Sequence, residues 1–142
     1  MIFAIVLVAR LLLGVFLAFL GGMAFHVMAM IILLSFYPPG SGVVIASSIL
    51  GGGFGGSFIG FLAWYTPGGA RKQNMIVLAL ALGGGIAGAL LGLLQGVGQE
   101  NIGGMPGIPE LANLIYGTAI GVNLAPLAYF LFRRWRGERF VA

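Results

Sequence analysis

The run ALGGGIAGALLGLLQG, residues 81–96, places a glycine at every fourth position of an almost entirely apolar segment: Gly84, Gly88, Gly92 and Gly96. A glycine in a helix interior costs about 1 kcal/mol relative to alanine, so this regular spacing needs a physical reason. Positions four residues apart form one ridge of an α-helix, and glycine there lets another helix backbone approach closely. The run therefore predicts tight helix packing, which we favour over a glycine-lined pore.

The composition of the whole chain identifies the solvent around that helix. Of 142 residues, 60% are apolar and only 7% are charged, which is too few charges to cover a surface in water. Glycine contributes 26 residues, but the high apolar content is not that of a flexible linker. We therefore expect an integral membrane protein with its glycines inside helices.

Four apolar segments are long enough to cross a membrane, since about 20 residues span a hydrocarbon core about 30 Å thick. The helices are expected at about 2–36, 42–65, 75–97 and 111–133. The first segment is too long for one span, so Arg10 is expected to reach the interface while Leu11–Leu34 crosses the bilayer. Short Pro- and Gly-rich loops predict antiparallel neighbours. The expected fold is an all-α four-transmembrane-helix bundle, with residues 1–142 as a single transmembrane domain.

The basic residues predict the orientation of the bundle. With four spans, both termini and the 66–74 loop share one side, and all seven Lys and Arg residues lie on or nearest to that side. The positive-inside rule then places both termini in the cytoplasm. Four arginines near the C-terminus are expected to contact anionic lipid: Arg133, Arg134, Arg136 and Arg139. Because the positive charge is explained in this way, no nucleic-acid partner is expected.

Small residues at the same spacing recur in the other spans. The predicted helix-packing positions are Gly52, Gly56, Gly60, Gly84, Gly88, Gly92, Gly96, Gly117 and Gly121. In lipid, helices associate through close van der Waals contact and interhelical hydrogen bonds, and a glycine zipper provides that contact. The second and third spans carry glycine on more than one face. Besides membrane lipids, we therefore expect copies of the chain or other membrane subunits as partners.

Few side chains in the spans are suited to chemistry. The three carboxylates lie in loops or in the tail and there is no cysteine, so no catalytic residue, metal site or enzymatic activity is expected. His26 is the exception, because a histidine near small residues could ligate haem or chlorophyll. The favoured reading is a hydrogen bond to a polar residue of a neighbouring helix, for which the candidates are Ser47, Asn113, Thr118 and Asn123. No cofactor is predicted beyond the haem or chlorophyll alternative.

Two stretches resemble known small membrane proteins. PPGSGVVIASSILGGGFGGSFIGFLAWY, residues 38–65, is similar to the second helix of the four-helix fluoride channels, but Ile45 stands near that family's key asparagine. The strong charge bias also differs from the dual insertion of those channels. Residues 51–97 are similar to the glycine-rich hairpin of the three-helical transglycosylase-associated membrane proteins. Because of these differences, we do not assign the sequence to either family.

The sequence predicts a non-catalytic membrane protein that acts as an accessory or assembly subunit of a larger membrane complex, or as a self-associating scaffold. The alternative is a small oligomeric channel or holin-like pore in which glycine faces line a path between subunits. A third interpretation is a haem- or chlorophyll-binding subunit that uses His26 as its ligand.

Overall fold

The computed structural model describes residues 2–96 and 108–137, and these residues form helices joined by turns, with no strand among them. The elements are α1 (Ile2–Leu34), α2 (Ser41–Ser47), η1 (Ser48–Gly55), α3 (Gly56–Phe61), α4 (Arg71–Gly96) and α5 (Ile108–Trp135). α2, the π-helix η1 and α3 follow one another without a break and form the second span. The four helical rods are long and apolar enough to cross a membrane, which makes a multi-pass membrane protein the natural description.

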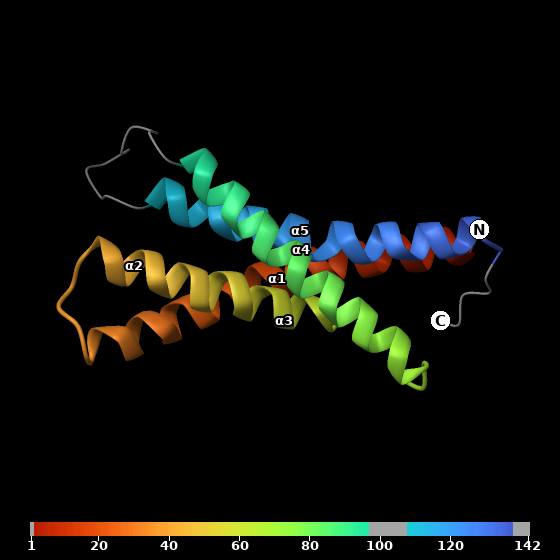
Figure 1. The fold of residues 1–142 in the computed structure, drawn as a ribbon, viewed down its shortest axis with the longest axis horizontal. Coiled ribbons are helices and arrows are strands. Elements are labelled where there is room, and N and C mark those ends of the chain that lie inside the picture. The colour runs from red at the N-terminus through yellow and green to blue at the C-terminus, as the bar shows by residue number, and fades with distance from the viewer. Residues whose placement is uncertain (1, 97–107, 138–142) are drawn as a thin grey trace.

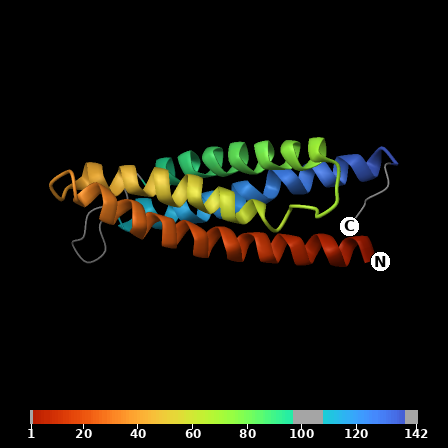
Figure 2. The same ribbon diagram turned by 90° about the horizontal axis from the view of Figure 1, so that it is seen from below.

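The four spans form two antiparallel hairpins that pack on each other. α1 pairs with the second span, and α4 pairs with α5 through the most extensive contact between any two of the described elements. α1 and α4 lie on opposite sides of the bundle, with the second span and α5 between them (Figures 1 and 2). The start of α1, the end of α5 and the turn before α4 all lie at one end of the elongated molecule, which we call the terminal end.

The turn between the second span and α4 places helix ends where the apolar pattern did not predict them. The second span ends at Phe61 rather than near 65, and α4 begins at Arg71 rather than at 75. Asn74 explains the early start of α4, because its side chain accepts a hydrogen bond from the Thr66 N–H (3.1 Å) and donates one to the Thr66 carbonyl (3.0 Å). The polar residues 71–74 are therefore helical because the Asn74 side chain bonds to the backbone of the preceding turn.

The other helix ends also depart by a few residues from the expected limits. α1 ends at Leu34 instead of 36, and α5 covers Ile108–Trp135 instead of 111–133. α5 continues through the buried Pro126 as a single helix and is followed by Gly137, whose φ of 78° is the left-handed conformation that commonly ends helices. Residue 97, expected in the third span, lies outside the described residues.

Arg10 lies within the fold, and α1 continues through it without a break. α1 is one continuous helix of 33 residues, and an Arg10 Nη1 atom donates to the Trp64 carbonyl and to the Thr66 hydroxyl, each at 3.3 Å. The physical reason is that carbonyl and hydroxyl oxygens at the end of the second span satisfy the guanidinium within the fold. The first third of α1 thus packs into the bundle, where Leu7 belongs to the main apolar cluster.

Large side chains and glycines divide the interior between them. The main apolar cluster lies toward the terminal end and contains the fully buried Trp64, Val77, Val122 and Phe130. A smaller cluster of Ala89, Leu114 and Ile115 lies toward the opposite end. Between and around these clusters the helices approach one another through glycine.

Candidate functional site

Backbone atoms of α4 and α5 approach one another closely along the predicted glycine row. Three α4 positions face three α5 positions, and the pairs are Gly84 with Gly121, Gly88 with Gly117, and Gly92 with Asn113. A Cβ atom added to Gly88 would collide with the carbonyl oxygen of Gly117, and one added to Gly117 would collide with the carbonyl oxygen of Gly88. Only glycine permits this approach, because each helix occupies the space of the other's side chains. The surroundings of Gly96, the last residue of α4, lie outside the described residues.

The predicted glycine row of the second span lies in the junction between α1 and α5. A Cβ on Gly56 would lie 2.9 Å from the Ala18 carbonyl oxygen of α1 and 3.4 Å from a methyl carbon of Thr118 in α5. Gly60 similarly faces Ala18 and α5, whereas a Cβ on Gly52 would meet only side chains of α5. These glycines therefore bring α1 and α5 to the second span together.

The additional glycine faces, from which a partner was expected, meet helices of the same chain. Gly51 and Gly55 lie against α1, and Gly85 lies against Ser57 of α3. Among the glycines described within the spans, only Gly42 and Gly83 have open space where a side chain would be. Glycine on several faces thus reflects how closely the second span and α4 are surrounded within one chain.

The π-helix η1 holds the only histidine of the chain in a hydrogen bond. The Ser48 hydroxyl donates to the Val44 carbonyl (2.7 Å) and lies 3.4 Å from Nδ1 of His26, which is 6% exposed. Because the Ser48 hydroxyl donates to Val44, its contact with Nδ1 is a hydrogen bond in the tautomer whose Nδ1 carries the proton. The neighbouring-helix partner expected for His26 is therefore Ser48, next to the predicted candidate Ser47.

Backbone rather than empty space surrounds the small residues near His26. A Cβ on Gly51 would lie 2.5 Å from the His26 amide nitrogen, and one on Gly22 would lie 3.2 Å from the Gly52 carbonyl oxygen. The sequence suggested that glycines beside the imidazole leave room for a flat macrocycle. In the structure these glycines bring α1 and η1 into contact instead.

A buried polar bond that the sequence did not predict joins the two hairpins. The Trp64 indole N–H donates to Asn123 Oδ1 (2.8 Å), and Asn123 Nδ2 donates to the Ala119 carbonyl (2.6 Å). Trp64 and Asn123 are both almost completely buried, and Trp64 stacks on Phe130 with ring centroids 5.9 Å apart. A tryptophan at the end of an apolar segment usually marks the membrane interface. The one available signal was Asn123, because a polar side chain inside a span requires a partner.

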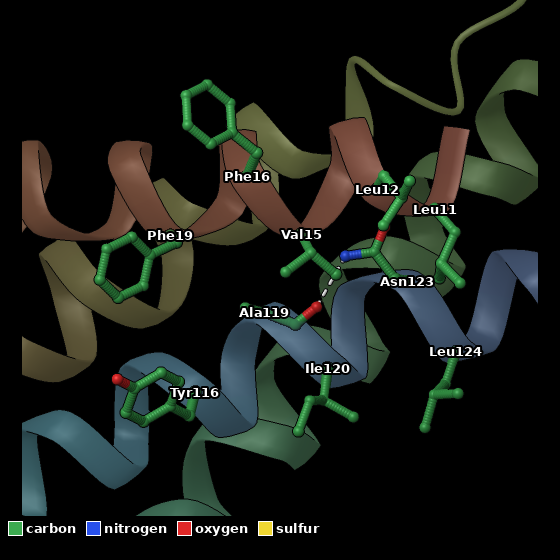
Figure 3. A pocket seen from close by; sticks show the side chains of 10 residues that line it. All are labelled: Leu11, Leu12, Val15, Phe16, Phe19, Tyr116, Ala119, Ile120, Asn123 and Leu124. Carbon is green, nitrogen blue, oxygen red and sulfur yellow. Dashed lines mark hydrogen bonds between the residues drawn. The ribbon is translucent and has the colours of Figure 1, made fainter. Parts of the chain in front are cut away.

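The outer face of α5 carries a ridge between two grooves. The ridge consists of Tyr116, Ile120 and Leu124, which are 58%, 56% and 55% exposed. The groove between this ridge and α1 measures about 510 Å³, and Figure 3 shows α1 side chains along one wall and the ridge along the other. The groove between the ridge and α4 measures about 530 Å³. We call this ridge with its two flanking grooves the α5 face.

Polar groups gather at one end of the α4-side groove. Gln95 and Asn113 line it together with Tyr116, at the end of the bundle opposite the terminal end. Within the described residues, none of these three side chains forms a hydrogen bond, although the Tyr116 ring stacks on Phe19 at 6.0 Å. The groove thus combines an apolar wall with donors and acceptors whose partners do not lie in the described part of the bundle.

The arginines expected to contact lipid lie at the terminal end, on different faces of α5. Arg133 Nη1 donates to the Gln73 side chain (2.7 Å), whereas Arg134 lies over the Phe3 ring of α1 with 5.4 Å to the centroid. Arg136 is exposed and lies 5.5 Å from the centroid of the Phe132 ring. Arg139 lies outside the described residues. The tail arginines are therefore not one uniform patch.

The chemistry of the described side chains gives no indication of a metal centre. Among residues 2–96 and 108–137, no three His, Cys, Asp or Glu side chains come together. Comparison of the chain with protein families, with curated proteins and with solved structures finds no match.

Proposed function

We propose that this chain is a non-catalytic integral membrane protein that acts as a self-associating scaffold or as a subunit of a larger membrane complex. In this proposal both termini are cytoplasmic, since the basic residues gather at the terminal end. Glycine-zipper packing holds the single chain together, and the α5 face forms the contact with a second copy. The observation that carries the proposal is the α5 face, with its exposed ridge and two flanking grooves.

The shape of the α5 face supports contact between two copies of the chain. Tyr116, Ile120 and Leu124 are four residues apart and form one of the ridges by which helices interdigitate. Because ridge and groove lie side by side on one surface, a two-fold arrangement lets each copy place its ridge in the other's groove. A surface with only a ridge or only a groove would need a different partner.

The polar groups of the α4-side groove also favour protein over lipid as the occupant. Acyl chains offer no hydrogen-bond partner to Gln95, Asn113 or Tyr116, whereas the same groups of a second copy do. Interhelical hydrogen bonds in membranes contribute about 0.6 kcal/mol each, so they specify register more than they supply affinity. Apolar contact along the ridge then has to provide most of the association energy.

The experiment is native mass spectrometry of the chain extracted in mild detergent, with two variants. Ile120→Trp enlarges the ridge, while Leu50→Trp makes the same kind of change at a residue of η1 that is 54% exposed and lies outside both grooves. We expect a defined assembly for the wild type and for Leu50→Trp, and its loss in Ile120→Trp. A wild-type chain that arrives as a monomer without other polypeptides would contradict the proposal.

The same preparations separate a scaffold from a pore. A scaffold reconstituted into vesicles leaves ion flux at the level of empty vesicles, even where its assembly is intact. Flux that depends on the assembly and disappears in Ile120→Trp would favour a channel or holin-like pore between subunits and would overturn the scaffold reading.

A further inference from the structure

A basic groove lies at the terminal end, between the first turn of α4 and the last turns of α5. Its volume is about 330 Å³, and its cationic side chains are Lys72, Arg133 and Arg136. No carboxylate lines this groove in the described part of the chain. The groove is separate from the α5 face, with which it shares no residue.

Each cation of the groove stands one helical turn from an apolar or aromatic side chain that also lines it. The pairs, each four residues apart, are Lys72 with Ile76, Arg133 with Tyr129, and Arg136 with Phe132. Lys72 and Arg133 lie near the end of their helices and Arg136 directly follows α5, while the apolar partner in each pair is nearer the middle of the span. The groove is consequently cationic where the candidate spans end and apolar one turn deeper.

Two kinds of contact fix the cationic side of the groove. Arg133 Nη1 donates to Gln73 Oε1 at 2.7 Å, which links α5 to α4 across the groove. The guanidinium groups of Arg133 and Arg136 lie 5.7 and 5.5 Å from the centroids of the Tyr129 and Phe132 rings. These contacts hold two positive charges over aromatic rings, so part of the side-chain ordering needed for binding an anion is already present.

We propose that this groove binds a phosphate group, and specifically the phosphodiester headgroup of an anionic phospholipid. Lys72, Arg133 and Arg136 surround the headgroup, and the first part of the acyl chains lies against Ile76, Tyr129 and Phe132. Basic pockets between membrane helices bind acidic lipid headgroups, and the change from charged to apolar with depth matches the polarity of a phospholipid. Inorganic phosphate carries the same charged chemistry without the acyl chains.

Arg134 shows why the proposed site is more specific than attraction of a basic tail to an acidic membrane. Arg134 neighbours Arg133 in sequence, but its guanidinium lies over Phe3 of α1, on another face of α5. Arg71 likewise precedes Lys72 but does not line the groove. General attraction to an anionic surface treats these four residues alike, whereas the proposed site needs Lys72 and Arg136 and not Arg71 and Arg134.

The test measures lipid binding to the full chain by native mass spectrometry, with phosphatidylglycerol and phosphatidylcholine of the same acyl chains. A juxtamembrane cation contributes about fivefold in affinity for an acidic lipid, so Lys72→Gln with Arg136→Gln should weaken phosphatidylglycerol binding by roughly 30-fold. Arg71→Gln with Arg134→Gln removes the same charge from the same end and should weaken it less than about fivefold. All four residues are exposed, which makes both variants compatible with folding.

Three outcomes would overturn the proposal. Equal losses in the two double variants would mean that only net charge attracts the lipid. Equal binding of phosphatidylglycerol and phosphatidylcholine to the wild type would remove the headgroup preference. In a parallel arm with inorganic phosphate, displacement of the lipid at millimolar concentration would identify a free phosphate as the ligand. If the double groove variant does not fold, Lys72→Gln and Arg71→Gln alone make the same comparison, with about a fivefold loss expected only for Lys72→Gln.

Discussion

The two hairpins of this protein use the same residue, glycine, to solve different packing problems. In the α4–α5 hairpin, glycines of two regular helices face one another, and the backbone of each helix occupies the space where the other would carry a side chain. In the other hairpin, the second span contains the glycine-rich η1 and meets α1, α4 and α5 around its circumference. A single row of glycines therefore lets a helix pack closely against one neighbour. Several rows let the second span pack against three neighbours at once.

The π-helix η1 lies in the span that meets three neighbouring helices. A π-helix turns less per residue than an α-helix, so the rows of residues in η1 point in directions that a regular helix would not reach. Gly51 and Gly55 face α1, and Gly52 faces α5. A Cβ added to Gly53 would lie 3.6 Å from the Ala89 Cβ of α4. Glycine makes this possible because it has no side chain to collide with any of the three neighbours.

The most damaging change that we expect is a large side chain in the α4–α5 hairpin. Gly88→Leu forces the two helices apart, because even its Cβ would fall on the Gly117 carbonyl oxygen. We expect a loss of about 3 kcal/mol or more in the free energy of unfolding, measured in mixed micelles by tryptophan fluorescence, to which the buried Trp64 and the exposed Trp135 contribute. Gly83→Leu is the control on the same helix, since no atom lies within 4 Å of its Cβ position.

A stability that Gly88→Leu leaves unchanged would mean that α4 and α5 do not touch in the membrane. Bulky substitutions at Gly88 or Gly92 disrupt the packing within a single chain, whereas Ile120 is exposed and a substitution there acts on association.

A smaller change tests whether η1 points its glycines as described. Gly51→Ala adds one methyl group against the backbone of Phe25 and His26, whereas Gly53→Ala adds it at ordinary contact distance from Ala89. We expect Gly51→Ala to lower the free energy of unfolding by about 2 kcal/mol, and Gly53→Ala to leave it unchanged or raise it by up to about 1 kcal/mol. The reverse order would place the second span in another register and remove the contrast between the hairpins.

These two predictions also mark how far the sequence determines the fold. The four spans follow from the length of the apolar runs, and the row Gly84–Gly88–Gly92 marks the α4 face that meets another backbone. The π-helix could not be predicted from the sequence, because a run of glycines has no apolar periodicity that would reveal the number of residues per turn. The burial of Trp64 does not follow either, since a tryptophan at the end of an apolar run predicts a membrane interface.

The candidate surfaces were less accessible to sequence reasoning than the spans. Tyr116, Ile120 and Leu124 are apolar or aromatic in an apolar helix, and nothing in their spacing distinguishes an exposed ridge from a buried one. Among the tail arginines, sequence identified the charge but not that Arg133 and Arg134 lie on different faces. Which residues share a groove depends on how the helices pack, and that is decided by contacts distant in sequence.

The bond between Trp64 and Asn123 tests the junction between the hairpins rather than either one alone. Asn123→Leu removes the acceptor and leaves the indole N–H buried without a partner. We expect a loss of about 1–2 kcal/mol in the free energy of unfolding. Thr118→Val is the control, because the buried bond that it removes, from the Thr118 hydroxyl to the Leu114 carbonyl, lies within α5. Equal effects of the two substitutions would mean that the junction is held by apolar packing alone.

The smallest expected effect separates two adjacent serines of the first hairpin. Ser47 and Ser48 are both buried and both donate to the Val44 carbonyl, at 2.9 and 2.7 Å, but only Ser48 also lies within 3.4 Å of His26 Nδ1. Ser48→Ala therefore removes an interhelical bond, whereas Ser47→Ala removes only a bond within the second span. We expect a loss of about 0.6 kcal/mol for Ser48→Ala beyond that of Ser47→Ala. In the background of His26→Leu this excess should disappear, because the donor is then absent. An excess that persists without the imidazole would show that Ser48 stabilises the start of η1 by itself, and the contrast between the hairpins would then lie in glycine packing alone.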